Sequence, residues 1–198
     1  MHRSFSERQL VALLRQGDEG AFRYLVRRYQ KKLYAVAFGI TLDREESFDI
    51  VQDVFLNAYR KIGRFRQQSS LSTWLHRITV NQCLNRKRRW RRRLRRQHRS
   101  IDSPELDPVP LAAPAGSDPE TLYNGKLAVQ ELWRALRQVP EQARAVFVLK
   151  EIQGMSYDEI ARDLHIKKGT VSSRLFYVRR RLKAELQAFL EGETGHEE

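Results

Sequence analysis

The feature that most constrains the fold is a proline-rich segment near the middle of the chain. Five of the six prolines in this 198-residue sequence lie between Ser103 and Pro119. The stretch 101–120 also holds five acidic residues and no lysine or arginine. Proline at this density prevents a continuous helix, and the polar composition buries little apolar surface. We therefore predict a flexible acidic linker at residues 98–121 that joins two small domains, residues 1–97 and 122–192, with a disordered tail at 193–198.

Apolar residues before the linker recur at spacings of three and four, which predicts amphipathic helices. Gly17 and Asp18 indicate the end of a short first helix and the cap of a second. A third helix is expected to start near Asp43 and to stop at Gly63. A fourth is expected to open near Ser72. No stretch alternates as a strand would, so we predict an all-α fold with four helices in the first domain.

The second domain is also predicted to be helical. Its first helix is expected to span residues 122–138, and Pro140 suits the first position of the next helix. Ser156 and Glu159 match a capping box, which predicts a short helix directly after Ser156. A brief turn then leads into a long final helix that begins near Lys168.

The last two predicted helices have the pattern of a helix-turn-helix. Ala161 is the small residue at the helix contact, Ile166 is the apolar residue of the turn, and Val171 and Leu175 return an apolar face. His165 stands where glycine is common, so the turn is not required to be the standard one. Hydroxyl and cationic groups on the second helix suit base edges and phosphates in a major groove. An ordinary helical hairpin with a solvated basic face is the alternative. The candidate DNA-binding residues are Lys168, Thr170, Ser172, Ser173, Arg174, Phe176 and Tyr177.

A basic tract, Arg86 to Arg99, holds ten lysines and arginines in fourteen positions. The whole chain has a formal net charge of +13, which is typical of proteins with a polyanionic partner. Just upstream, Thr79, Asn81, Gln82 and Asn85 carry short polar side chains that can hydrogen-bond an exposed base. By charge alone the tract also fits a localisation signal or a nonspecific tail. The candidate nucleic-acid residues are Asn81, Asn85, Arg86, Lys87, Arg88 and Arg89.

Acidic and amide residues gather on the predicted third helix at Asp49, Gln52, Asp53 and Asn57. An acidic helical edge is unexpected in a DNA-binding protein with this much positive charge. It is either a solvated surface or a docking edge for a basic protein partner.

Several functional classes are disfavoured by what the sequence lacks. The histidines are scattered, and no spacing fits a metal site, a phosphate-binding glycine loop or a nucleophile with its base. We therefore expect no enzyme activity, no cofactor or metal and no small-molecule substrate. Cys83 is the only cysteine, so an intramolecular disulfide is impossible. No segment is long and apolar enough to be a signal peptide or to span a membrane, so we expect a cytoplasmic protein.

Four blocks of sequence carry a resemblance to a known family. They are GDEGAFRYLVRRYQ, FDIVQDVFLNAYRKIGRF, STWLHRITVNQCLNRKRR and VPEQARAVFVLKEIQGMSYDEIARDLHIKKGTVSSRL. In this order, with the acidic linker before the last block, they resemble the extracytoplasmic-function (group IV) sigma factors of bacterial RNA polymerase. The resemblance is to sigma factors of the sigma-E type. The resemblance implies transcription initiation by −35 recognition and −10 melting. The alternative that stays open is a free-standing helix-turn-helix regulator that binds duplex DNA without polymerase.

The resemblance also implies roles for particular residues. The first domain resembles sigma region 2, which implies that Asp49, Gln52, Asp53 and Phe55 bind the clamp helices of the polymerase β′ subunit. Asn81 would capture a flipped base of the −10 element. The second domain resembles sigma region 4, which implies contacts with the −35 element and with the β flap. An anti-sigma factor that covers these surfaces is a further implied partner. Many relatives carry basic residues where this chain has Ser172 and Tyr177, so the −35 preference cannot be copied from them.

Overall fold

The computed structural model describes the backbone of residues 5–97 and 131–194, and the side chains of residues 5–86 and 131–187. The predicted linker at 98–121 lies outside these residues, as does the start of the helix predicted at 122–138. The chain divides into two compact units, Met1–His98 and Arg99–Glu198. Every regular element in the described residues is helical, which confirms the all-α prediction.

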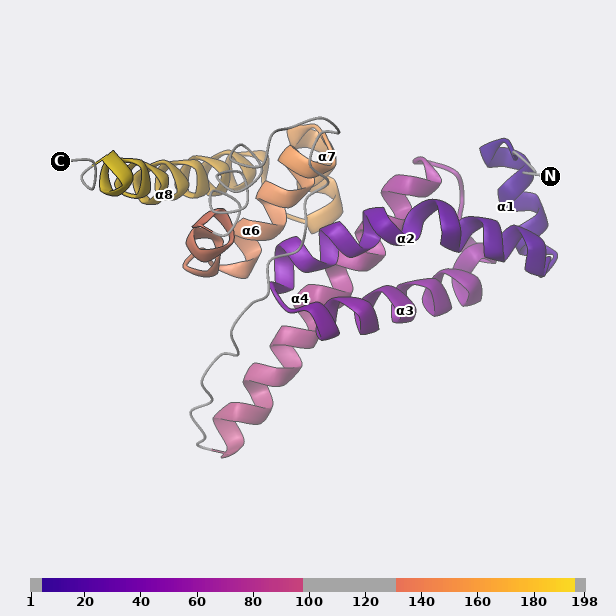
Figure 1. Cartoon of the computed structure of the whole chain (residues 1–198). Coiled ribbons are helices and arrows are strands. Elements are labelled where there is room, and N and C mark those ends of the chain that lie inside the picture. Colours follow the sequence, from indigo (N-terminus) through magenta and orange to yellow (C-terminus); the bar gives the residue numbers. More distant parts are fainter. Residues whose placement is uncertain (1–4, 98–130, 195–198) are drawn as a thin grey trace. The chain divides into compact units, whose positions relative to one another are not determined.

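Within residues 5–97 the first unit contains four α-helices, as predicted. They are α1 (Glu7–Arg15), α2 (Glu19–Thr41), α3 (Arg44–Lys61) and α4 (Leu71–Gln97), with a 3-10 turn at Ile62–Arg64. Helices α2, α3 and α4 pack on one another in pairs, and α1 packs on α2 (Figure 1). The last turns of α4 extend beyond the ends of α2 and α3 (Figure 1).

Side-chain caps explain where the helices of the first unit begin. Ser6 and Gln9 form a capping box at α1, and Asp18 accepts a hydrogen bond from the Ala21 N–H at α2. Asp43 accepts the Glu46 N–H across 2.8 Å, so α3 begins close to Asp43, as predicted. Each such cap contributes about 1 kcal/mol by satisfying a free donor of the first turn.

Two predicted boundaries near α4 are displaced by a residue or two. Helix α4 begins at Leu71 rather than Ser72, because the Ser70 hydroxyl accepts the Thr73 N–H at 3.1 Å. Helix α3 ends at Lys61, and Gly63 lies inside the 3-10 turn that follows.

Helix α1 makes two polar contacts with the segment that leads into α4. The Glu7 carboxylate accepts the Leu71 N–H at 2.9 Å, which supplies an acceptor to the first residue of α4. The guanidinium of Arg15 donates to the Phe65 carbonyl at 2.6 Å. These contacts cross 64 and 50 positions of sequence, so they hold α1 against the start of α4.

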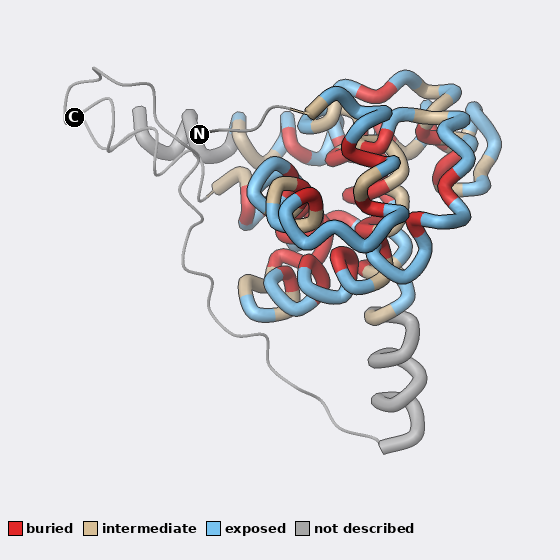
Figure 2. Tube along the Cα trace, turned by 90° about the vertical axis from the view of Figure 1, so that its right-hand side faces the viewer, coloured by how far each residue is buried: buried red, intermediate tan, exposed pale blue. Residues whose placement is uncertain are grey.

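The core of the first unit lies between α2, α3 and α4, where buried positions recur along the inward faces (Figure 2). The Cys83 thiol is fully buried there. His76 is also buried, and its Nε2 has no hydrogen-bond partner among the described residues. Burial, together with the positive charge of Lys32, lowers the pKa of His76 to about 4. The core aliphatic residues are Leu25, Leu33, Val36, Ile40, Ile50, Val54, Leu71, Leu75 and Val80.

The second unit has a helical segment at residues 131–137, then α6 (Glu141–Phe147), a π-helical turn (Val148–Ile152), α7 (Tyr157–Leu164) and α8 (Lys168–Thr194). Helices α6 and α7 both pack on α8. Residues 193 and 194 belong to α8, so the tail predicted to start at 193 begins as helix, and the rest of it lies outside the described residues. The buried Leu, Ile and Val residues described there are Leu136, Val139, Val146, Val148, Leu149, Ile160, Val171, Leu175, Val178 and Leu182.

Pro140 and Arg144 shape the start of α6. Pro140 is the N-cap residue, one position earlier than predicted. Arg144 is buried, and its guanidinium donates to the Leu136 carbonyl at 3.1 Å. Burial lowers the pKa of Arg144 to about 10, against a smaller opposing effect of Glu141. Arg144 therefore serves the fold rather than an external ligand.

Candidate nucleic-acid and protein interfaces

Three of the four residues predicted to bind a protein partner share one exposed face of α3. Asp49, Gln52 and Asp53 are all exposed, and their spacing of three and four places them along one side of the helix. Buried residues of α3, such as Ile50 and Val54, occupy the opposite side. The acidic edge is therefore a solvent-facing surface.

Phe55 was predicted to belong to this surface, but the structure places it in the core. Its side chain is 6% exposed and lies edge-to-face with Phe22, with 6.4 Å between the ring centroids. Leu56, the next residue, is 52% exposed instead, and Phe48 is 58% exposed. A helix turns by about 100° per residue, so a shift of one position exchanges a core residue for a surface residue.

The sequence reasoning missed these exposed apolar residues. Phe48 and Leu56 are apolar but do not follow the spacing of three and four that marks the buried side of α3. This departure from the pattern could have identified them in the sequence. Together with the polar residues they form what we call the α3 outer face, composed of Phe48, Asp49, Gln52, Asp53, Leu56 and Tyr59. Exposed apolar groups beside charges are typical of protein interaction sites.

The candidate nucleic-acid residues of α4 begin at Asn81. Asn81 and Asn85 are exposed and lie four positions apart, so they share one side of the helix. Neither side chain forms a hydrogen bond with another described residue, so their amides are available to a ligand. Thr79 is different, because it is fully buried and its hydroxyl donates to the Leu75 carbonyl at 2.9 Å. The prediction that Thr79 can hydrogen-bond a base is therefore wrong.

Arg86 joins this surface to the α3 outer face. Its Nη2 lies 3.0 Å from Oδ2 of Asp49, and both side chains are partly exposed. The remaining predicted residues are Lys87, Arg88 and Arg89, which form the next turn of α4. The structure describes their backbone but not their side chains.

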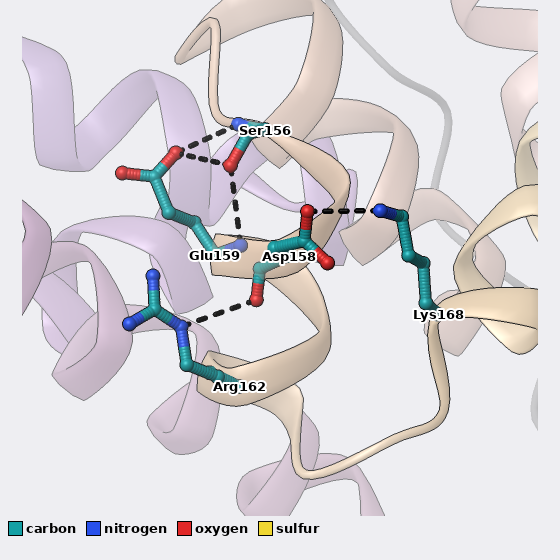
Figure 3. Close-up of polar contacts among 5 residues, drawn as sticks. All are labelled: Ser156, Asp158, Glu159, Arg162 and Lys168. Carbon is teal, nitrogen blue, oxygen red and sulfur yellow. Dashed lines mark hydrogen bonds and ion pairs between the residues drawn. The ribbon is translucent and has the colours of Figure 1, made fainter.

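The helix-turn-helix predicted in the second unit is present in α7 and α8. Ser156 and Glu159 form the predicted capping box (Figure 3), and these hydrogen bonds lower the pKa of the Glu159 carboxyl. His165 adopts the left-handed conformation, with φ 53°, and the Ile166 N–H donates back to the Ala161 carbonyl at 3.0 Å. This is the hydrogen bond of a Schellman motif, so the turn is the standard one although its residue is not glycine.

The apolar contacts of this motif are partly as predicted. Val171, Leu175 and Ile160 are fully buried. Ile166 is only half-buried, although it was predicted as the buried residue of the turn.

The seven candidate DNA-binding residues of α8 differ in their exposure. Phe176 is 68% exposed and Tyr177 is 41% exposed, which is unusual for aromatic side chains without a partner. Lys168, Ser172 and Ser173 are also exposed, whereas Thr170 and Arg174 are half-buried.

Several cations of α8 are held by residues of the preceding elements. Lys168 pairs with Asp158 of α7 at 2.9 Å (Figure 3). Arg179 pairs with Glu151 of the π-helical turn at 2.7 Å, and this hydrogen bond raises the pKa of Arg179. Arg174 donates to the amide oxygen of Gln142 in α6 at 2.8 Å. These three side chains are thus each held by an intramolecular contact before any ligand binds.

The described residues hold neither a candidate metal site nor a candidate membrane span. No three His, Cys, Asp or Glu side chains gather there in a way that could hold a metal ion. Nor does any helix in the described ranges combine the length and apolar character needed to cross a bilayer.

Comparison with protein families matches both units. Residues 25–97 match the family model of sigma-70 region 2, and residues 129–182 match that of sigma-70 region 4. The first match contains the α3 outer face and α4, and the second contains α6, α7 and the start of α8.

Comparison with individual proteins gives matches over nearly the whole chain. The ECF RNA polymerase sigma factor SigM of Mycobacterium tuberculosis is 37% identical over 185 residues, covering 93% of this chain and 86% of the relative. The ECF RNA polymerase sigma-E factor of Escherichia coli is 32% identical over 197 residues, covering 96% and 99%. Among solved structures, the sigma factor RpoE of Bartonella quintana, in complex with the anti-sigma factor NepR, has a TM-score of 0.68 and 25% identity, covering 84% of this chain and 96% of that one.

Proposed function

The chain belongs to the extracytoplasmic-function sigma factors of bacterial RNA polymerase, and on that premise we propose which of its surfaces bind the polymerase and the promoter. As a sigma factor, the protein directs core RNA polymerase to particular promoters and initiates transcription there. A free-standing helix-turn-helix regulator would not need a region 2 domain, so that alternative is not favoured.

The α3 outer face is the proposed docking site for core polymerase. It lies inside the region 2 match, and it combines exposed carboxylates with exposed apolar groups. Leu56 and Phe48 would supply apolar contact, whereas Asp49 and Asp53 would pair with cations of the polymerase. Leu56 takes the place that Phe55 had in the sequence-based prediction. This face is the observation that carries the proposal, because a subunit that only bound DNA would gain nothing from it.

The exposed side of α4 is the proposed site for the −10 element. Asn81 and Asn85 offer free amide donors and acceptors to an unstacked base. Arg86 and the basic residues after it would contact phosphates of the opened strand and the adjacent duplex. The free energy needed to open the promoter duplex is then smaller, because binding of the unstacked bases offsets the few kcal/mol lost when they unstack.

The exposed side of α8 is the proposed site for the −35 element. Ser172, Ser173 and Arg174 provide the donors and acceptors that read base edges in a major groove. Phe176 and Tyr177 add apolar contact of the kind that recognises a thymine methyl group.

An anti-sigma factor is a further proposed partner. The support is the Bartonella quintana structure, in which the related sigma factor is bound by the anti-sigma factor NepR. We infer that such a partner would cover the α3 outer face, which would prevent polymerase binding, or the exposed side of α8, which would prevent promoter binding. We also infer that the protein acts in the cytoplasm, where RNA polymerase is, and that it contributes binding energy without catalysing a reaction.

The proposal is tested by association with core RNA polymerase at moderate salt, where nonspecific attraction is weakened. We expect Asp53→Lys to weaken core binding at least about tenfold, since it places a cation where a carboxylate faced the partner. Glu19→Lys is the matched control. Glu19 is an exposed carboxylate of α2 whose one ion pair with a described residue is with Arg23 on its own helix, at 3.4 Å. Equal binding by both variants would remove the α3 outer face from the docking site.

A further inference from the structure

Four cations of α8 are held by another side chain, and these four fall into two classes according to the group that holds them. Lys168, Arg179 and Arg181 are each paired with a carboxylate, from Asp158, Glu151 and Glu185 respectively. Arg174 is held by a neutral group instead, the side-chain amide of Gln142.

This difference matters for a ligand that carries phosphates. A carboxylate cancels the charge of its cation, and it repels a phosphate that approaches the same group. A cation in such a pair binds DNA only after it exchanges partners. The Gln142 amide leaves the charge of Arg174 intact and occupies one N–H at Nη2, so the remaining guanidinium donors stay available.

The position of Arg174 suits it to base recognition. Tyr177, three positions further along α8, flanks it on one side and is exposed, whereas Val171 and Val178 flank it on the other side and are buried. Arg174 is half-buried at the edge between these two sides, where α6 packs on α8. A long side chain at an edge has several possible directions, and the hydrogen bond across 2.8 Å selects one of them.

We propose that Gln142 is a positioning residue for promoter recognition, which holds the Arg174 guanidinium in the orientation that reads one base of the −35 element. Gln142 lies on α6, outside the two helices of the helix-turn-helix motif, and it was not among the residues singled out from the sequence. The inference rests on the proposed role of α8 in −35 recognition.

The test uses the full-length protein with core polymerase. Wild-type holoenzyme first selects a promoter from a randomised duplex library, and each position of its −35 element is then varied in turn. Arg174→Ala is expected to reduce discrimination at one position by about 5- to 150-fold. Gln142→Ala is expected to reduce discrimination at that same position by about 2- to 12-fold, the range expected for loss of one hydrogen bond. The control is Gln138→Ala, which alters an exposed glutamine whose side chain has no described partner.

Two further variants distinguish positioning from a structural role. In the Arg174→Ala background, Gln142→Ala should have no further effect on discrimination. Gln142→Glu keeps an acceptor for Arg174 but turns the contact into a carboxylate pair, so it should reduce the base preference at that position, weaken binding to all sequences and flatten the salt dependence. An acidic residue is acceptable in the first turn of α6, so folding should be preserved.

The outcomes that overturn the inference are separate from those that overturn the function. If Arg174→Ala reduces discrimination and Gln142→Ala does not, the positioning role is wrong and −35 recognition by α8 stands. If the losses of discrimination add in the double variant, Gln142 acts on DNA independently of Arg174, and the positioning role is again wrong. If Arg174→Ala leaves every −35 preference unchanged, the proposed role of Arg174 is wrong and the positioning role with it.

Discussion

Arg86 of α4 and Asp49 of α3 form an ion pair, with 3.0 Å between Nη2 and Oδ2. The pair joins a residue that we propose to bind promoter DNA to one that we propose to bind polymerase. Both side chains are partly exposed, and pairs of this kind contribute about 1 kcal/mol or less. Either residue can therefore exchange its intramolecular partner for an intermolecular one at little cost.

Asp49→Asn should strengthen the binding of DNA by the free subunit, because it releases Arg86. We expect a gain of about 2- to 5-fold for a short oligonucleotide at low salt, measured by fluorescence anisotropy. Asp53→Asn is the matched control, with the same change of charge one turn away. If the two variants gain equally, the effect comes from net charge, and the ion pair is not its source.

Leu56→Ala and Phe55→Ala should separate docking from folding. Phe55 is buried, so Phe55→Ala should lower the free energy of unfolding by about 3–5 kcal/mol in urea titrations. Leu56→Ala removes an exposed side chain, so the free energy of unfolding should stay within about 0.5 kcal/mol of wild type. Its affinity for core polymerase should nevertheless fall at least about fivefold. Unchanged core binding would exclude Leu56 from the interface.

Asn81→Ala should impair promoter opening more than the initial binding of duplex DNA. The reason is that an unstacked base becomes available to the amide only after the duplex opens. Opening is followed by the fluorescence of 2-aminopurine placed in the −10 element, and initial binding by gel shift at low temperature. Gln30→Ala, on the exposed side of α2, is the control. Equal losses in both measurements would contradict the assignment.

His165→Gly should stabilise the second unit by about 0.5–1 kcal/mol. His165 has φ 53°, a conformation that costs a residue with a Cβ more than it costs glycine. The side chain is exposed, so its removal forfeits little contact. Thermal unfolding would show the gain, and −35 discrimination should not change. A lower Tm for the glycine variant would show that the imidazole contributes to the turn.

His76 should make the first unit sensitive to acid. Its pKa is lowered in the folded state from 6.5 to about 4, so between these values the unfolded chain binds the extra proton. Stability therefore falls as pH drops below 6.5, by about 2–3 kcal/mol between pH 7.5 and 4.5. Between pH 7.5 and 4.5, the free energy of unfolding of His76→Gln should fall by about 2–3 kcal/mol less than that of wild type. Gln30→Ala, which alters an exposed residue of α2 that does not titrate, should follow the wild-type curve.

The parts of this fold that the sequence predicted correctly depend on local rules. The caps at Asp18, Asp43 and Ser156 were predictable, because a side-chain acceptor and a free N–H lie within three residues of each other. The exposed α3 residues Asp49 and Asp53 were also found, because charge and helical spacing both indicate solvent.

The errors arose where neighbours distant in sequence decide the outcome. Phe55 and Leu56 are adjacent apolar residues, and only the contact of Phe55 with Phe22 of α2 shows which of them is buried. Thr79 looked available for a ligand, but packing of α4 buries it and its hydroxyl bonds within the helix. The bond between Gln142 and Arg174 spans 32 positions, and no local pattern predicts it.

The contact between Glu7 and Leu71 has a consequence for the exchange of modules between sigma factors. The region 2 match begins at residue 25, so a chimaera joined there would omit α1. The first residue of α4 would then lose the carboxylate that accepts its N–H, and the Phe65 carbonyl would lose the guanidinium of Arg15. The smallest transferable unit that keeps the start of α4 as it is here therefore begins at Ser6, the residue that caps α1.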